Sequence, residues 1–203
     1  MTDTIPYYDT STIDYKLLKA YYKNDTLNLK KLQEYAARVN TKLKWEQDLD
    51  SCIDEVKFED IKSDEAYRFV YSSAFCPYTT LITIIRYGDS FSLRSIVYQY
   101  AWDSTPCKIV DKSSINIDSA SWDKFQESLI VADFWGLKQD NGKHGLDGST
   151  LEIYGFKKGT NIQWNPDKST FISRWSPGYA AIFHCFSLLL KFSKTRKGCV
   201  TVS

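Results

Sequence analysis

The period of the hydrophobic pattern changes once along this chain, and that change constrains the fold more than any motif. Between Tyr15 and Trp45, apolar residues recur at three- and four-residue steps with no glycine or proline, which is typical of amphipathic helices. From Ala66 onward the period becomes two, in runs rich in β-branched and aromatic residues, which is typical of strands. The acidic stretch Gln47–Glu65 carries neither period and is interpreted as a linker.

The first region predicts a helical hairpin within residues 1–46. Leu29, Leu32 and Tyr35 begin one apolar stripe, and a shorter helix is expected before it, with Asn24-Asp25-Thr26 as break and cap. Residues 66–203 are expected to form an α+β domain that makes one compact unit with these helices.

The second region predicts strands interrupted by two helices. Strands are expected at Tyr67–Tyr71, Leu81–Tyr87, Phe91–Tyr100, Lys108–Ile117, Thr150–Phe156, Thr160–Trp164 and Thr170–Trp175. Gly88-Asp89 is interpreted as a two-residue hairpin turn. One helix is expected from a cap at Asp118 to about Trp135-Gly136, and another from Tyr179 to Phe192. Strands in runs, with the helices segregated, indicate an α+β fold with a mainly antiparallel sheet.

Composition excludes several classes of protein. With 203 residues, 43% of them hydrophobic, the chain can bury a core. Lys and Arg total 26 against 25 for Asp and Glu, so charge does not favour nucleic acid or an anionic membrane as a partner. The longest apolar stretch, Ala180–Leu190, is far shorter than the ~20 residues of a membrane span. No secretory signal is recognised, so a cytoplasmic protein is expected unless a signal was removed.

The cysteines and histidines predict neither disulfides nor a metal site. The 5 cysteines are odd in number and widely spaced, which argues against a disulfide framework and suits a reducing cytoplasm. No two have the C-x-x-C spacing, and the 2 histidines, His144 and His184, are too few for a histidine-rich site. The sequence has no phosphate-binding glycine loop and no G-x-S-x-G motif. We therefore expect no cofactor and assign no catalytic residue.

Short segments in the second half of the chain follow one another in a recognisable order. They are Tyr67-Arg68-Phe69, Phe75-Cys76-Pro77, Ala132–Leu137, Gly145–Gly148 and Arg174–Pro177. In this order they resemble a family of uncharacterised bacterial proteins with Y-R-F, A-D-F-W-x-L, G-L-D-G and R-W-S-P segments, over residues 66–192. The resemblance implies a shared fold, but it does not imply any particular activity. That family usually has a glutamate where this chain has Tyr154, so Glu152 is not its equivalent.

The shared segments predict a structural cluster of Trp135, Asp147, Arg174 and Trp175. A guanidinium beside Asp147 and stacked on an indole would satisfy both charge and packing, so we expect an Asp147–Arg174 pair close to Trp135 or Trp175. A pocket for a small anion at Arg174 is the alternative. Asp147 can also hold the Asp-Gly turn through its own side chain. His144 and Glu152 are weaker site candidates.

Three functions follow from these observations. The first is a non-enzymatic protein-binding module, for example a toxin-neutralising immunity protein, because 6 Trp and 14 Tyr suit an interaction surface. The second is a small-ligand-binding protein or hydrolase with a cleft near Asp147 and Arg174, joined by His144 and Glu152. The third is a structural or assembly role, which the sequence does not separate from the first. The sequence does not predict an oligomeric state.

Overall fold

The computed structural model describes residues 19, 22–32, 34, 52–99, 107–143, 148–159, 166–177 and 180–195. The chain divides into two compact units, Met1–Asp54 and Glu55–Ser203. In the first unit, η1 (Tyr22–Asn24) precedes the helical residues 26–32. Asp25 accepts a hydrogen bond from the Asn28 N–H at 3.1 Å, as expected of the predicted cap. Most of the predicted helical hairpin lies outside the described residues, so the hairpin stays a prediction.

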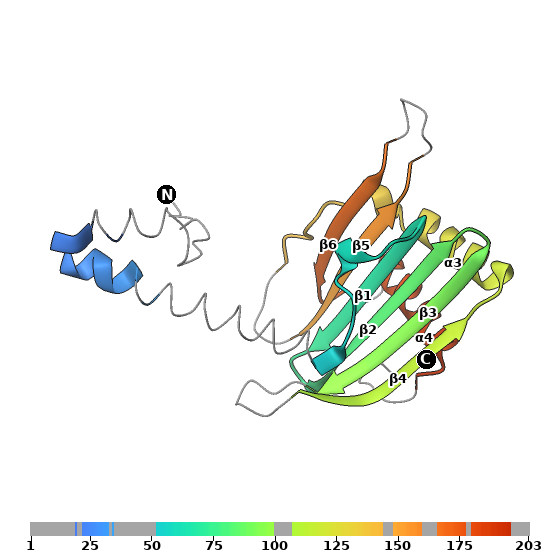
Figure 1. Ribbon diagram of the computed structural model, residues 1–203, viewed down its shortest axis with the longest axis horizontal. Coiled ribbons are helices and arrows are strands. Elements are labelled where there is room, and N and C mark those ends of the chain that lie inside the picture. Colours follow the sequence, from blue (N-terminus) through green and yellow to red (C-terminus); the bar gives the residue numbers. More distant parts are fainter. Residues whose placement is uncertain are drawn as a thin grey trace. The chain divides into compact units, whose positions relative to one another are not determined.

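The second unit is an α+β domain built on a 6-stranded antiparallel sheet (Figure 1). Its strands are β1 (Glu65–Ser73), β2 (Cys76–Tyr87), β3 (Ser90–Gln99), β4 (Lys108–Asn116), β5 (Ser149–Lys157) and β6 (Lys168–Trp175). The order across the sheet is β4-β3-β2-β1-β5-β6, so β1 is an inner strand that pairs with β2 and β5. The predicted fold class and antiparallel sheet are confirmed. The predicted strand Thr160–Trp164 lies outside the described residues.

The hairpin between β2 and β3 follows from a local signal in the sequence. Gly88-Asp89 joins Tyr87 to Ser90 as a two-residue turn, and Gly88 has a φ of 57°. This left-handed conformation is accessible to glycine without a steric cost, which explains the residue type at the turn. The Gly88 N–H also donates to the Asp64 carboxylate at 2.7 Å, which ties the turn to the start of β1.

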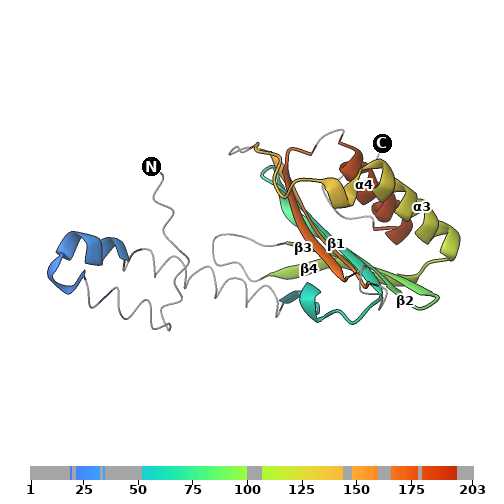
Figure 2. The same ribbon diagram turned by 90° about the horizontal axis from the view of Figure 1, so that it is seen from above.

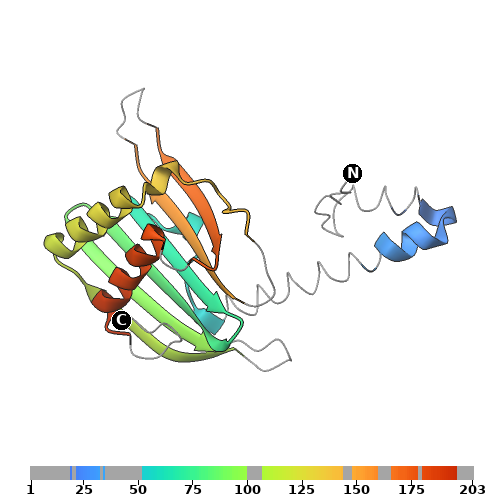
Figure 3. The ribbon, with the colours of Figure 1, turned by 180° about the vertical axis from the view of Figure 1, so that it is seen from behind.

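Both helices of this unit cover the same face of the sheet (Figures 2 and 3). α3 (Ser119–Val131) begins at Asp118, whose carboxylate accepts from the Ser121 N–H at 2.7 Å, as predicted. α3 ends before the predicted Gly136, because Asp133 adopts a left-handed φ of 47° and the chain continues into η3 (Phe134–Gly136). α4 (Ala181–Ser193) is the predicted C-terminal helix, shifted by a residue or two at its ends.

Aromatic rings join these helices to β1. The Tyr67 ring packs edge-on against Phe125 of α3 and Phe134 of η3, with ring centroids 5.3 and 5.4 Å apart. Phe69 stacks on Phe186 of α4 at 6.3 Å. Alternate residues of a strand share one side, so Tyr67 and Phe69 mark the side that we call the helix face. Buried aliphatic residues complete this core: Ile82, Ile84, Leu93, Leu151, Ile153, Ile172 and Leu189.

The opposite face of the sheet is buried at its centre and half-buried along β5. Residues 55–64, which include η2 (Phe58–Asp60), lie on this side (Figure 2), and we call them the strap and the side they cover the strap face. Arg68 on β1 and Thr83 on β2 are paired and buried there, as is Ile96 on β3. The strap has no periodic pattern, which is why the sequence predicts a linker, yet individual side chains fasten it to the sheet.

The cysteines differ from the prediction. Cys52, Cys76 and Cys107 are each disulfide-bonded, whereas Cys185 is a free, buried thiol. The expectation of a chain without disulfides is therefore wrong, because spacing along a sequence does not show which cysteines meet in space. Burial raises the pKa of Cys185, so this thiol remains in its unreactive protonated form.

Gly155 of β5 leaves room for the Phe134 ring. A Cβ at this position would lie 2.6 Å from Cε1 of Phe134. We predict that Gly155→Ala lowers the free energy of unfolding by about 1–3 kcal/mol, because the buried ring must move. Urea denaturation measures this loss. Adding Phe134→Leu makes space for the methyl group, so the double variant should lose less than the sum of the single variants. Strict additivity would contradict the contact.

Candidate functional site

The predicted cluster residues come from different places in the domain. Arg174 lies opposite Leu151 in β5, on the helix face, and its neighbour Trp175 alternates to the other face. Trp135 of η3 packs against the rings of Tyr67 and Phe134 and keeps 37% of its surface exposed. Arg174 and Trp175 therefore do not point toward a common pocket.

Asp147 and His144 lie outside the described residues, so the Asp147–Arg174 pair stays a prediction. Glu152 is described and belongs to the strap face, since it lies opposite Val70 of β1 and Ser173 of β6. It is therefore on the opposite side of the sheet from Arg174, and these two predicted site residues do not share a cleft.

Arg174 is buried and donates to backbone carbonyls. Its Nη2 donates to the Lys138 carbonyl at 2.7 Å, and its Nη1 donates to the carbonyls of Ser173 and Gln139 at 2.7 and 3.3 Å. Burial lowers the pKa of Arg174, and the charge of Asp140 opposes this shift. The contacts fasten the connection after η3 to β6, so the described partners of Arg174 give it a structural role.

Replacing Arg174 tests this role. We predict that Arg174→Met lowers the free energy of unfolding by about 2 kcal/mol or more, because the carbonyls of Lys138 and Gln139 lose a buried donor. Arg174→Lys keeps the charge but loses the planar fork, and should recover only part of that loss. Denaturation curves of both variants measure the effect. Full recovery by lysine would show that charge alone matters at this position.

Gly148 and Trp175 are in contact where β5 begins and β6 ends. A Cβ on Gly148 would lie 2.8 Å from Cζ2 of the Trp175 indole. The Trp175 carbonyl accepts from the Asn141 side chain at 3.0 Å, and the Ser176 N–H donates to the Ser149 carbonyl at 2.6 Å. These contacts hold the end of β6 against the start of β5.

A buried carboxylate that the sequence analysis missed lies on the helix face. Glu65 of β1 accepts a hydrogen bond from the Tyr67 hydroxyl at 2.6 Å. Its other oxygen is 3.6 Å from Nζ of Lys157 and 3.9 Å from Nη1 of Arg86. Arg86 and Lys157 lie directly opposite Glu65 on β2 and β5, so strand register places both cations beside it.

Because of the Glu65–Tyr67 contact, the free energy of unfolding should depend on pH in the alkaline range. Burial raises the pKa of Tyr67 well above its ordinary value, and the charge of Glu65 raises it further. The folded chain therefore retains a proton that the unfolded chain releases above about pH 10. The contribution of Tyr67 to stability is complete below that pH and is lost as the pH rises beyond it.

We predict that the advantage in unfolding free energy of the wild-type chain over Tyr67→Phe shrinks above about pH 10. The decrease should approach about 1.4 kcal/mol per pH unit, because the phenylalanine variant has no proton to release at this position. Urea denaturation of both proteins between about pH 8 and pH 11 measures the difference. A difference that stays constant over this range would contradict the burial of a protonated Tyr67.

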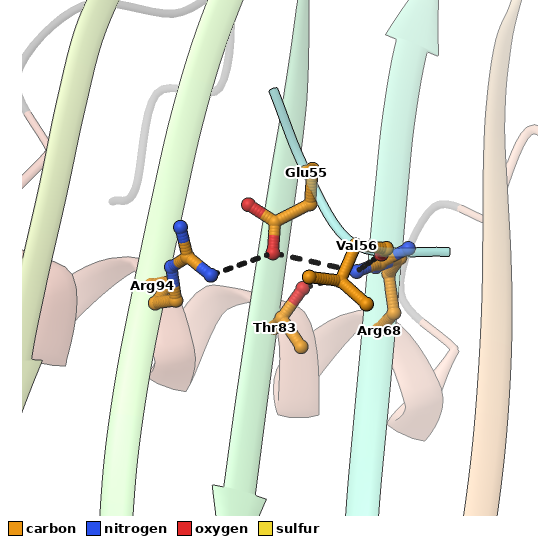
Figure 4. Close-up of polar contacts among 5 residues, drawn as sticks. All are labelled: Glu55, Val56, Arg68, Thr83 and Arg94. Atoms are coloured by element: carbon orange, nitrogen blue, oxygen red, sulfur yellow. Dashed lines mark hydrogen bonds and ion pairs between the residues drawn. The ribbon is translucent and has the colours of Figure 1, made fainter. Parts of the chain in front are cut away.

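A second charged cluster lies on the strap face (Figure 4). Oε1 of Glu55 is 3.2 Å from Nη1 of Arg94 and 3.5 Å from Nη2 of Arg68, and the Glu55 side chain is only 2% exposed. Arg68 Nε donates to the Thr83 hydroxyl at 3.0 Å, and its Nη2 donates to the Val56 carbonyl at 2.8 Å. One strap carboxylate thus bridges arginines from β1 and β3.

The environment of Arg68 explains why it can be buried. Burial lowers its pKa, and the negative charge of Glu55 opposes this shift. The Phe58 ring of η2 lies 5.7 Å from the guanidinium carbon, which adds a cation–π contact. The period-two pattern places Arg68 on the side away from Tyr67 and Phe69, but that pattern alone does not show that the strap covers this side.

The outer surface of the helix layer carries exposed apolar side chains. Ile130 and Val131, at the end of α3, are 77% and 79% exposed. Val131 also lines a shallow groove of about 390 Å³ between α3 and α4, together with Leu188, Lys124 and Glu127. His184 of α4, which the sequence places on an apolar helix, is a further lining residue of this groove.

Within the described part of the chain, no group of three or more His, Cys, Asp or Glu side chains could hold a metal ion. None of the helices described there has the length and apolar character needed to cross a membrane. No protein-family model, curated protein or solved structure matches the chain.

Proposed function

We propose that this chain is a protein-binding module that acts through the end of α3. The observation that carries the proposal is the exposure of Ile130 and Val131 beside the groove between α3 and α4. Burying such a side chain against a partner contributes roughly 1.5–3 kcal/mol. Clustered exposed apolar residues are typical of interaction sites, and Trp135, in the adjacent η3, adds an aromatic side chain of the kind enriched in interfaces.

The contacts of Arg174 argue against the alternative function, in which this residue binds a small anion. Its guanidinium donates to carbonyls of the chain itself, and Glu152 lies on the other side of the sheet. The described residues therefore give no support to a ligand-binding protein or hydrolase built on Arg174 and Glu152. The family resemblance remains a prediction. The narrower expectation of a toxin-neutralising immunity protein also remains one, and a neighbouring toxin gene would support it.

The disulfides bear on where such a module would act. Disulfide bonds form and persist in oxidising environments and are rare in a reducing cytoplasm. The bonded state of Cys52, Cys76 and Cys107 therefore supports maturation in an oxidising compartment rather than the predicted cytoplasmic location.

Photo-crosslinking at single positions tests the proposed surface. We predict that a photoreactive residue at Val131 captures a partner protein in host extracts, whereas the same residue at Phe75 does not. Phe75 is a matched control because it is also apolar and is 80% exposed, but belongs to the β1–β2 turn. Equal capture at both positions, or capture of only a second copy of this chain, would overturn the proposal.

Substitutions then show whether the captured partner depends on this surface. Ile130→Lys combined with Val131→Lys should weaken the affinity of the purified partner at least about tenfold, through loss of buried apolar area. Phe75→Lys should leave the affinity unchanged. Thermal unfolding should remain similar for these variants, since exposed side chains contribute little to stability. Unchanged affinity of the double variant, measured by calorimetry, would contradict the role of the end of α3.

A further inference from the structure

The Glu55 carboxylate makes fewer and longer contacts with Arg68 and Arg94 than two guanidinium groups can make with a carboxylate. Both guanidinium groups contact the same oxygen, Oε1, at 3.5 and 3.2 Å. Charge-assisted N–H···O bonds are ordinarily about 2.7–2.9 Å, and arginine often binds a carboxylate through two parallel bonds. The second oxygen, Oε2, is buried without a hydrogen-bond partner. The backbone of the strap thus holds Glu55 in a geometry that a freely oriented carboxylate could improve.

The Arg68 guanidinium is held in place by more than Glu55. Thr83 and the Val56 carbonyl fix the Arg68 guanidinium through separate hydrogen bonds, and the Phe58 ring lies beside it. Glu59 is a further acid whose charge acts on the pKa of Arg68. The Arg94 side chain is 31% exposed, so the cluster reaches solvent on the side of β3. Arg94 is therefore on the side from which a small anion would reach the cluster.

We propose that Arg68 and Arg94 form a carboxylate-binding site whose ligand in this chain is Glu55 of the strap. When the Glu55 carboxylate is removed, the site takes a small free monocarboxylate in its place. Glu55→Ala keeps the Cβ and removes a CH₂–COO⁻ group, so the space that it leaves has the size and charge of acetate. This site lies on the strap face and is independent of the surface proposed at the end of α3.

Thermal unfolding of the full-length, disulfide-bonded Glu55→Ala variant tests the site with acetate itself. Acetate should raise the Tm of the variant by about 2–4 °C at saturation, compared with chloride at the same ionic strength. The wild-type chain should respond equally to both salts, because Glu55 occupies the site. Pivalate, which is also a monocarboxylate but is much bulkier, should act on the variant only as chloride does.

Matched arginine variants identify the groups that bind. Adding Arg94→Gln to Glu55→Ala should abolish the acetate effect, whereas adding Arg86→Gln should leave it, because Arg86 belongs to the Glu65 cluster on the helix face. If Glu55→Ala does not stay folded, refolding yield in acetate and in chloride provides the same comparison. Equal effects of acetate and chloride on the variant, or an acetate effect that survives Arg94→Gln, would overturn the proposal.

Discussion

The packing of aromatic rings against β1 fixes the positions of the layers in this domain. Tyr67 contacts rings of α3 and η3, and Phe69 contacts a ring of α4, so one strand holds the helix layer. Because side chains alternate along a strand, the neighbouring Arg68 must face the other way, toward the strap. A single run of the sequence, Tyr67-Arg68-Phe69, therefore organises both sides of the sheet.

Burying a charge on each side of β1 requires partners, which come from the register of the sheet on the helix face and from both the sheet and the strap on the strap face. Glu65 meets cations on both neighbouring strands, and Arg68 meets a hydroxyl on β2 and a carboxylate on the strap. An ion left alone in such surroundings would cost several kcal/mol, so these pairs specify which segments must come together. On the strap face, the need of Arg68 for an acidic partner gives the strap, which has little regular secondary structure, a defined position on the sheet.

Local signals in the sequence predicted the parts of the fold that depend on neighbouring residues. The Gly88-Asp89 turn, the Asp118 cap and the period-two strands that fall within the described residues are confirmed because each depends on conformational preferences over a few residues. The sequence predicts an end of α3 near Gly136, which is several residues beyond the observed end at Val131. The left-handed residue that ends the helix is Asp133, and an aspartate gives no such signal in the sequence.

Features that depend on contacts between distant segments could not be predicted in the same way. Spacing did not show that Cys52, Cys76 and Cys107 are disulfide-bonded, nor that Glu55 reaches Arg94 two strands away from β1. Among the predicted site residues, Trp135 contacts aromatic rings and Arg174 contacts backbone carbonyls, and spacing along the sequence does not indicate these partners. The exposed residues Ile130 and Val131 were missed because a helical pattern does not show which apolar side chains remain uncovered.

The inner position of β1 also has a consequence for the order in which the chain assembles. β1 to β4 form a meander of sequential neighbours, whereas β5 must return to pair with β1 after α3 has been made. Contacts that are close in sequence form faster than distant ones, so we expect the meander to precede the addition of β5 and β6. During synthesis, one edge of β1 then presents unpaired backbone groups that could join another nascent chain. Chaperone capture at that stage would protect this edge until β5 emerges.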